Sequence, residues 1–130
     1  NVTTNIPADL PPITADKDKI YRVLSNLVNN AIKYTPNRGE ITITSQLKDD
    51  FILTSVADTG PGIEPEDRER VFDRFAQLSG ENARGSGFGL GLAFCRMTVE
   101  AHGGKIWIEA GDDDDGSRFN FTLPTAGPVP

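Results

Sequence analysis

The sequence has one cysteine, Cys95, and this scarcity narrows the classes of protein to which it can belong. A chain with a single cysteine forms no internal disulfide, so nothing in it indicates an oxidising compartment. Cys95 lies in an apolar stretch, where a lone thiol packs as a small hydrophobic side chain. No apolar run approaches the ~20 residues of a membrane-spanning helix, and no secretory signal is visible. We therefore expect a cytoplasmic domain without direct membrane contact.

Positive charge is scarce as well. The chain has 13 Lys and Arg residues against 19 Asp and Glu residues, which gives a formal net charge of -6 and a pI near 4.7. Domains that bind nucleic acid usually present a basic surface, so this balance argues against nucleic acid as a partner. A site for a single nucleotide is still compatible with it, because backbone amides and one or two cations suffice to bind a phosphate group.

Length and composition are those of one globular domain. Apolar residues make up 37% of the 130 residues and charged residues 25%, as in chains that bury a core. We predict a single domain over residues 1–130, with a disordered tail at about 125–130. The chain begins without methionine and in the middle of a sequence pattern, and we interpret it as an excised part of a larger protein.

Hydrophobic spacing predicts the main elements. Apolar residues recur with helical spacing in two long segments and alternate in several short ones. A polar, glycine-containing segment without periodicity, 77–86, is typical of a loop. The expected elements are helices at 17–34, 66–72 and 89–102, strands at 2–6, 41–45 and 51–57, and a final hairpin of 106–108 with 119–123.

The first of three motifs is Asn26-Leu27-Val28-Asn29-Asn30-Ala31-Ile32-Lys33-Tyr34, on the first helix. At about 100° per residue, Asn26, Asn30 and Lys33 form a polar stripe separate from the apolar face. Carboxamide oxygens suit Mg²⁺, and an ammonium on the same stripe can meet phosphates. A solvent-facing polar stripe would show the same pattern. Asn is a poor helix former, however, so three of them in five residues need a reason.

The second motif, Asp58-Thr59-Gly60-Pro61-Gly62-Ile63, follows a predicted strand directly. A carboxylate at a strand end can accept a hydrogen bond from an exocyclic amine such as that of adenine. The glycines Gly60 and Gly62 allow close approach of the backbone to a ligand. A plain turn has the same residues, and it remains the alternative for this motif taken alone.

The third motif, Gly85-Ser86-Gly87-Phe88-Gly89-Leu90-Gly91-Leu92, opens the second long helix. Unhindered amides at a helix N-terminus bind anions. Four alternating glycines would destabilise the start of a helix without a functional reason. The motif is not a P-loop, because no Gly-Lys-Ser/Thr follows, and its spacing differs from the dinucleotide-binding fingerprint. These features favour a phosphate cradle.

In content and order, these motifs resemble the catalytic ATP-binding domain of sensor histidine kinases, in the superfamily shared with gyrase, HSP90 and MutL. Residues 26–34 look like the N box, 58–63 the G1 box, 72–75 the F box and 87–92 the G2 box. The match covers nearly the whole chain. It implies the Bergerat fold, an α/β (α+β) two-layer sandwich with a mixed, largely antiparallel sheet and about three helices on one face. It also implies ATP and Mg²⁺ as cofactors.

The resemblance implies a role for each motif residue. Asn30 is the expected Mg²⁺ ligand, with Asn26 helping, and Lys33 and Tyr34 would contact phosphates or ribose. Asp58 would read the adenine amine. The catalytic set would be Asn26, Asn30, Lys33 and Arg84, where Arg84 is a candidate γ-phosphate contact at the end of an ATP lid. The other implied nucleotide contacts are Gly60, Gly62, Ile63, Phe75, Ser86, Gly87, Phe88, Gly89, Leu90, Gly91 and Leu92.

Two positions depart from the patterns of relatives. Phe88 stands where the usual G2 box has a small hydroxyl residue, so the resemblance supplies no hydroxyl contact there, and the aromatic ring could instead close the lid. Asn26 stands where ATP-hydrolysing relatives have a glutamate that activates water. An amide cannot act as a general base, so Asn26 favours phosphoryl transfer over hydrolysis.

The resemblance implies that the domain binds Mg-ATP and presents the γ-phosphate to a histidine on a separate dimerisation domain. It also implies a response regulator as the downstream partner in two-component signal transduction. The whole protein would be a homodimer and this part a monomer. His102, the one histidine, ends a predicted helix where the dipole favours a cation, and we do not expect it to be the acceptor. The alternatives are an ATP-hydrolysing relative, an anti-sigma-type serine kinase, and a non-catalytic interaction module.

Overall fold

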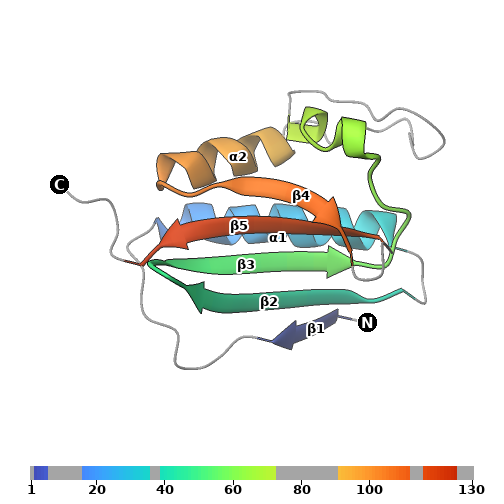
Figure 1. The fold of residues 1–130 in the computed structure, drawn as a ribbon, viewed down its shortest axis with the longest axis horizontal. Coiled ribbons are helices and arrows are strands. Elements are labelled where there is room, and N and C mark those ends of the chain that lie inside the picture. Colours follow the sequence, from blue (N-terminus) through green and yellow to red (C-terminus); the bar gives the residue numbers. More distant parts are fainter. Residues whose placement is uncertain (1, 6–15, 36–38, 73–90, 112–115, 126–130) are drawn as a thin grey trace.

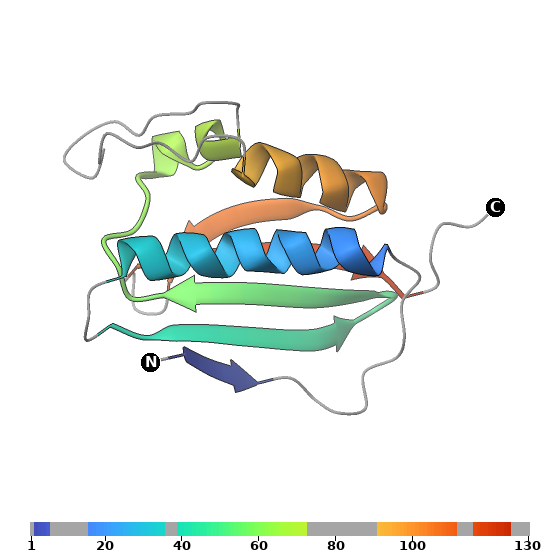
Figure 2. The ribbon, with the colours of Figure 1, turned by 180° about the vertical axis from the view of Figure 1, so that it is seen from behind.

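The computed structural model is a five-stranded sheet with two α-helices on one of its faces (Figures 1 and 2). It describes residues 2–5, 16–35, 39–72, 91–111 and 116–125. Along the chain the elements are β1 (Val2–Asn5), α1 (Lys17–Tyr34), β2 (Ile41–Lys48), β3 (Phe51–Asp58), the 3-10 turns η1 (Pro65–Asp67) and η2 (Arg70–Phe72), α2 (Gly91–Ala101), β4 (Ile106–Ala110) and β5 (Ser117–Pro124).

The strand order is β1-β2-β3-β5-β4, with β1 parallel to β2 and every other pair antiparallel. The sheet is therefore mixed and largely antiparallel, and the predicted fold class is confirmed. Its register places Asp58, the last residue of β3, between Ile41 on β2 and Ser117 on β5. Residues that are 59 positions apart in the sequence thus meet at the end of one strand.

Two features of the sequence stabilise the first helix: a capping residue at its start and a continuous apolar face. Asp16 is the N-cap, and its carboxylate accepts a hydrogen bond from the Lys19 amide at 3.1 Å, which satisfies a donor that the helix leaves free. The apolar residues Val23, Leu27 and Ala31 recur every four residues and are buried against the sheet. Burying such a face stabilises a helix in a protein more than intrinsic propensity does.

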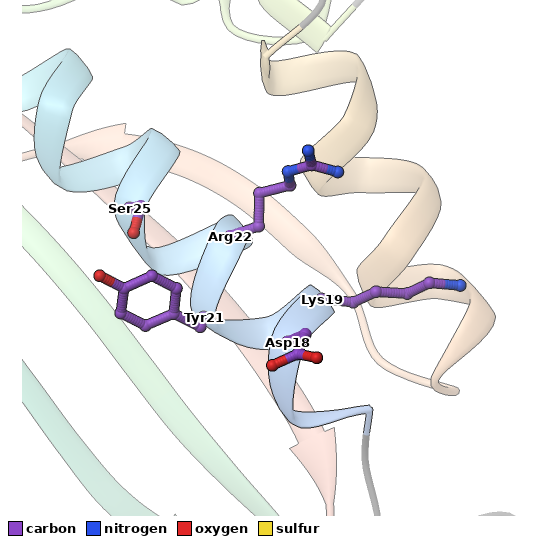
Figure 3. A pocket seen from close by; sticks show the side chains of 5 residues that line it. All are labelled: Asp18, Lys19, Tyr21, Arg22 and Ser25. Atoms are coloured by element: carbon purple, nitrogen blue, oxygen red, sulfur yellow. The ribbon is translucent and has the colours of Figure 1, made fainter.

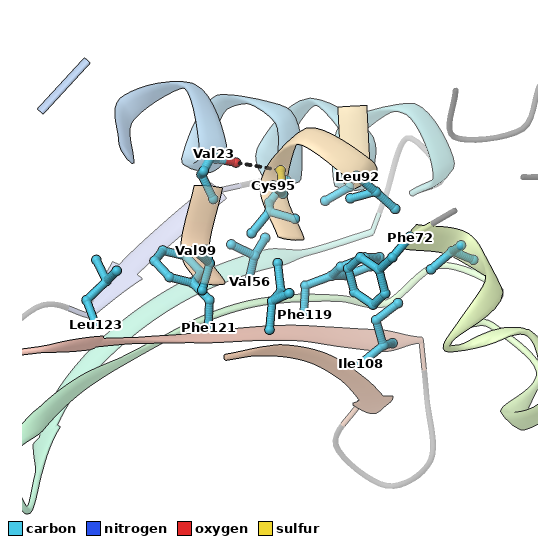
Figure 4. Packing of buried hydrophobic residues seen from close by; sticks show 14 of the residues in the cluster. Val23, Val56, Phe72, Leu92, Cys95, Val99, Ile108, Phe119, Phe121 and Leu123 are labelled. Carbon is cyan, nitrogen blue, oxygen red and sulfur yellow. Dashed lines mark hydrogen bonds between the residues drawn. The ribbon is translucent and has the colours of Figure 1, made fainter. Parts of the chain in front are cut away.

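The core lies between the helices and one face of the sheet (Figure 4). Along β3 and β5, alternate side chains such as Val56, Phe119 and Phe121 point into it, as the period of a strand requires. Cys95 on α2 belongs to the core as expected, and its thiol donates to the Val23 carbonyl with a sulfur–oxygen distance of 3.7 Å. Burial raises the pKa of Cys95 to about 12, so the thiol is neutral and unreactive at physiological pH.

One predicted helix is replaced by two shorter turns. The segment 66–72 forms η1 and η2, in which the amides of Asp67 and Phe72 bond to carbonyls three residues earlier. A segment of seven residues gains too few hydrogen bonds to offset the cost of starting an α-helix. Among the described residues, no helix is both long enough and apolar enough to cross a membrane.

His102 directly follows the last residue of α2, and both nitrogens of its ring make hydrogen bonds. Its Nε2 accepts a hydrogen bond from the Asp16 amide at 3.0 Å, so the ring proton lies on Nδ1, which donates to the Thr98 carbonyl at 2.8 Å. The ring therefore connects the start of α1 to the end of α2. That the helix dipole favours a histidine at this position stays a prediction.

Candidate functional site

A polar pocket of about 180 Å³ lies where the second half of α1 meets the first turn of α2. The end of β3 lies toward the same end of the sandwich as the end of α1 and the start of α2 (Figures 1 and 2). The pocket brings together five residues that the sequence predicted for one site and one that it did not. Its lining residues are Asn26, Asn29, Asn30, Lys33, Gly91 and Leu92.

Asn26 links the two helices at this pocket. Its side-chain nitrogen donates to the Gly91 carbonyl over a long distance of 3.5 Å, and the carboxamide is half-buried. Gly91 has no Cβ, and one added there would lie 3.8 Å from the Asn26 carboxamide carbon. The residue at position 26 therefore contributes to placing the start of α2 over the polar stripe of α1.

Asn29 is the lining residue that the sequence did not predict. It is exposed and lies about 60° around the helix from Asn26, by the 100° advance per residue. The signal was present, because Asn29 and Asn30 are adjacent in the motif. The predicted stripe was too narrow, because it included only the residues at i, i+4 and i+7.

The donor set of the pocket is neutral or positive. Three carboxamides and the Lys33 ammonium line it, and none of the lining residues that the structure describes is a carboxylate. In the described segments, no cluster of three His, Cys, Asp or Glu side chains could hold a metal ion. A divalent cation here would take neutral oxygen ligands from Asn side chains and its negative ligands from a bound phosphate, which is how proteins commonly hold Mg²⁺.

Asp58 is a buried carboxylate with both oxygens engaged. Only 6% of the residue is exposed; its Oδ1 accepts the Gly60 amide at 2.9 Å and its Oδ2 accepts the Ser117 hydroxyl at 3.2 Å. Burial raises the pKa of this carboxyl, and the hydrogen bonds from Gly60 and Ser117 oppose that shift. Each carboxylate oxygen can accept a second hydrogen bond, so the group is oriented and retains capacity for a donor from a ligand.

Ser117 is the second residue that the sequence did not predict, and no local pattern marks it. It contacts Asp58 because β5 pairs with β3, with Asp58 opposite Ser117. Gly116 and Gly62 let the two turns approach each other: a Cβ on Gly116 would lie 1.8 Å from the Asp58 carbonyl, and Gly62 has a φ of +82° and packs on the Gly116 carbonyl. Neither turn tolerates a larger residue without rearrangement.

The structure places the other predicted residues as follows. Gly60 is buried in the turn after β3, and Ile63 packs partly buried against the core. Tyr34 is the last residue of α1. The predictions that fall outside the described residues are those for Phe75, Arg84, Ser86, Gly87, Phe88, Gly89 and Leu90.

A second hollow, of about 440 Å³, lies beside the first half of α1 (Figure 3). Its lining includes Asp18, Lys19, Tyr21, Arg22 and Ser25, of which all but Ser25 are exposed. These residues come from one helix, and Figure 3 shows Tyr21 and Arg22 projecting in different directions. None of the described residues of the three motifs lines this hollow, so we assign the site to the smaller pocket and to Asp58.

Sequence comparison finds one family over most of the chain. Residues 15–127 match the family described as histidine kinase-, DNA gyrase B-, and HSP90-like ATPase. The adaptive-response sensory kinase SasA of Synechococcus sp. (strain CC9311) is 43% identical over 124 residues, which are 95% of this chain and 32% of that protein. The chain thus spans about a third of the length of this curated relative.

Comparison with solved structures also finds histidine kinases. The nucleotide-free catalytic domain of histidine kinase ThkA superposes with a TM-score of 0.82 at 33% identity, covering 98% of this chain and 81% of that one. The structure of ThkA in complex with response regulator protein TrrA matches with a TM-score of 0.76 at 32% identity, covering 96% of this chain and 34% of that one.

Proposed function

Because the chain belongs to the family of histidine kinase-, DNA gyrase B- and HSP90-like ATPases, as an ATP-binding domain of the histidine kinase type, we propose that it binds Mg-ATP and presents the γ-phosphate for transfer to a histidine outside this chain. Residues 1–130 would form this single ATP-binding domain of a longer protein. The observation that carries the proposal is the pocket in which Asn26, Asn30 and Lys33 of α1 face the glycine start of α2.

The pocket chemistry favours transfer over hydrolysis. Hydrolysis needs a base that activates water, and the polar side chains among the described lining residues are amides and an ammonium. Phosphoryl transfer mainly requires that the phosphate be positioned and its charge neutralised, which this donor set can do. Asn30 would be the main Mg²⁺ ligand, Asn26 would assist it, and Lys33 and Tyr34 would contact phosphates or ribose.

Asp58 would accept a hydrogen bond from the adenine amine. The Gly60 amide and the Ser117 hydroxyl orient the carboxylate, and this supports the role. A group that is already held in its binding orientation loses less entropy when the ligand binds. Gly60, Gly62 and Ile63 would shape the adenine pocket.

The remaining contacts are proposals from the sequence. Gly87, Gly89 and Gly91 would wrap the phosphates, and Arg84 would approach the γ-phosphate. The other nucleotide contacts of this segment would be Phe75, Ser86, Phe88, Leu90 and Leu92.

The phosphoryl acceptor would lie in the parent protein, on a dimerisation domain. The one histidine of this chain is a poor candidate, since both ring nitrogens of His102 already make hydrogen bonds. A response regulator would receive the phosphoryl group afterwards, as the complex of ThkA with TrrA suggests by analogy. The parent would be a homodimer, and ATP use supports a cytoplasmic location for this domain.

The raised pKa of Asp58 predicts how binding depends on pH. Only the ionised carboxylate has full capacity to accept from the adenine amine, so ATP affinity should fall on acidification with a midpoint above 3.8, the ordinary value. The same shift means that the folded chain holds this proton more tightly than the unfolded chain does. The stabilising contribution of the protonated group is complete below the unfolded pKa and is lost as pH rises through the folded one. Calorimetry from pH 7.5 downward measures the midpoint, and Asp58→Asn should remove it.

The proposal is tested with the purified chain and an unreactive ATP analogue. We expect binding that Mg²⁺ strengthens and no appreciable ATP hydrolysis. With ATP and the histidine-bearing domain of the parent protein, we expect acid-labile phosphorylation of that domain. Absence of nucleotide binding would refute the proposal. Rapid hydrolysis by the isolated chain would support an ATPase instead, and phosphorylation of a serine partner but not of the histidine would support a serine kinase.

A further inference from the structure

Arg96 on α2 contacts two other side chains. One is Phe72 in the 3-10 turn η2, and the other is Glu69, the residue just before that turn. Its guanidinium carbon lies 4.6 Å from the centre of the Phe72 ring, and its Nη2 lies 2.6 Å from Oε1 of Glu69. Both partners belong to the short segment that ends at Phe72. The views in Figures 1 and 2 agree that η2 lies close to the start of α2.

The two contacts differ in kind. Phe72 is 3% exposed and belongs to the core, so its ring holds the guanidinium against a fixed surface. Glu69 is 76% exposed, and an exposed ion pair adds little to stability. The Glu69 contact therefore mainly orients the fork of the guanidinium, while Phe72 fixes its place. Glu100, on the next turn of α2, is a weaker partner at 3.9 Å.

These contacts join the two described segments that flank residues 73–90. Phe72 is the last described residue before that segment and Gly91 the first after it. The sequence between them contains most of the third glycine motif. Arg96 therefore links η2 to the helix α2, whose first residues Gly91 and Leu92 line the polar pocket.

We propose that Arg96 is a positioning residue for the phosphates of the nucleotide. It holds η2 against α2 so that the start of α2 stays over Asn26 and Asn30. This inference rests on the proposed function. It assigns to Arg96 no contact with the nucleotide itself, and it predicts that loss of Arg96 weakens binding of the phosphates while leaving recognition of the adenine at Asp58 unchanged.

The test compares affinities for ATP and for adenosine, which lacks the phosphates. For Arg96→Gln we expect ATP affinity to fall about tenfold, the size typical of residues that orient a ligand-binding group, and adenosine affinity to change less than about twofold. Arg96→Lys keeps a cation over Phe72 without the fork, so it should recover part of the loss. Glu69→Gln should lower ATP affinity by about threefold. The control is Arg22→Gln, which removes a comparable contact between an arginine and an aromatic ring, that of Arg22 on α1 with the Phe94 ring of α2 at 5.2 Å.

Two results overturn the inference, and they are distinguishable. If the unaltered chain binds no ATP, the proposed function fails and this inference fails with it. If the unaltered chain binds ATP but the ratio of ATP to adenosine affinity is the same in the Arg96 variants, the inference fails alone and Arg96 is only structural. A lower melting temperature with an unchanged ratio leads to the same conclusion, and Glu69→Gln decides between the two roles if Arg96→Gln does not fold.

Discussion

Asp58→Asn is expected to weaken ATP binding by roughly 100-fold while leaving the fold intact. A hydrogen bond to an ionised group contributes about 1.5–3 kcal/mol, and about 1.4 kcal/mol corresponds to a tenfold change in affinity. The amide nitrogen introduced by the substitution would also face the adenine amine, donor against donor. Calorimetry with ATP at neutral pH measures the loss.

The fold should survive because the surroundings accept an amide. The Asn oxygen can take the Gly60 amide, and the Asn nitrogen can donate to the Ser117 hydroxyl, but it cannot accept the bond that Asp58 receives from the Ser117 backbone amide. Burial already disfavours the ionised form of Asp58. A neutral amide of the same shape avoids that cost, which offsets the lost bond from the Ser117 backbone, so we expect the thermal stability of the variant to stay close to that of the unaltered chain.

Inosine triphosphate makes this test specific. Its base has a carbonyl in place of the adenine amine, so the unaltered chain should bind it much more weakly than ATP, and Asp58→Asn should narrow or reverse this preference. Asp50→Asn is the matched control, since Asp50 is an exposed carboxylate in the turn between β2 and β3, at the other end of β3. Equal affinity of the unaltered chain for the two nucleotides would contradict the adenine-reading role.

The parts of the fold that the sequence predicted are those determined by neighbours in the sequence. The helix α1 has an N-cap at Asp16 and a sustained apolar stripe, and its predicted bounds are those of the structure. The hairpins follow from alternating residues on either side of polar turns. The segment 66–72 was predicted less well, because its few residues fit a helix and a pair of 3-10 turns about equally.

The parts that could not be predicted depend on pairing between distant segments. Ser117 reaches Asp58 through strand register, and Arg96 meets Phe72 through the packing of α2 on η2. The His102 ring accepts a hydrogen bond from the Asp16 amide, 86 residues away in the chain. In each case no pattern in the sequence marks the contact, and the residues meet only because the tertiary structure brings distant segments together. The motifs predicted which residues belong to the site, but not the residues that hold them in place.

Asn30→Ala is expected to remove the Mg²⁺-dependent part of ATP binding, with a loss of roughly 100-fold or more in the presence of Mg²⁺. Changes in groups that only orient a metal ligand cost about 10–100-fold, and removal of a ligand should cost at least as much. Because the described lining residues supply no carboxylate, none of them offers an anionic group to replace the lost oxygen. Phosphoryl transfer to the acceptor histidine should fall with it, since the charge of the γ-phosphate would be poorly neutralised.

The loss should be separable from any effect on folding. Alanine is the best helix former and asparagine a poor one, so the substitution in α1 should stabilise the helix by a few tenths of a kcal/mol. We therefore expect an unchanged or higher melting temperature together with weaker binding, which is typical of a residue retained for function at some expense in stability. Differential scanning calorimetry beside the binding measurement tests both at once.

Chelation of the metal provides the decisive comparison. In excess EDTA, Asn30→Ala and the unaltered chain should bind ATP with affinities within about threefold, because neutral amides contribute little to binding without the cation. Gln46→Ala, which removes an exposed carboxamide from β2 on the sheet face away from the helices, should bind Mg-ATP as the unaltered chain does. If Asn30→Ala weakened binding equally with and without Mg²⁺, Asn30 would contact the nucleotide directly, and the metal would have to be held by other groups.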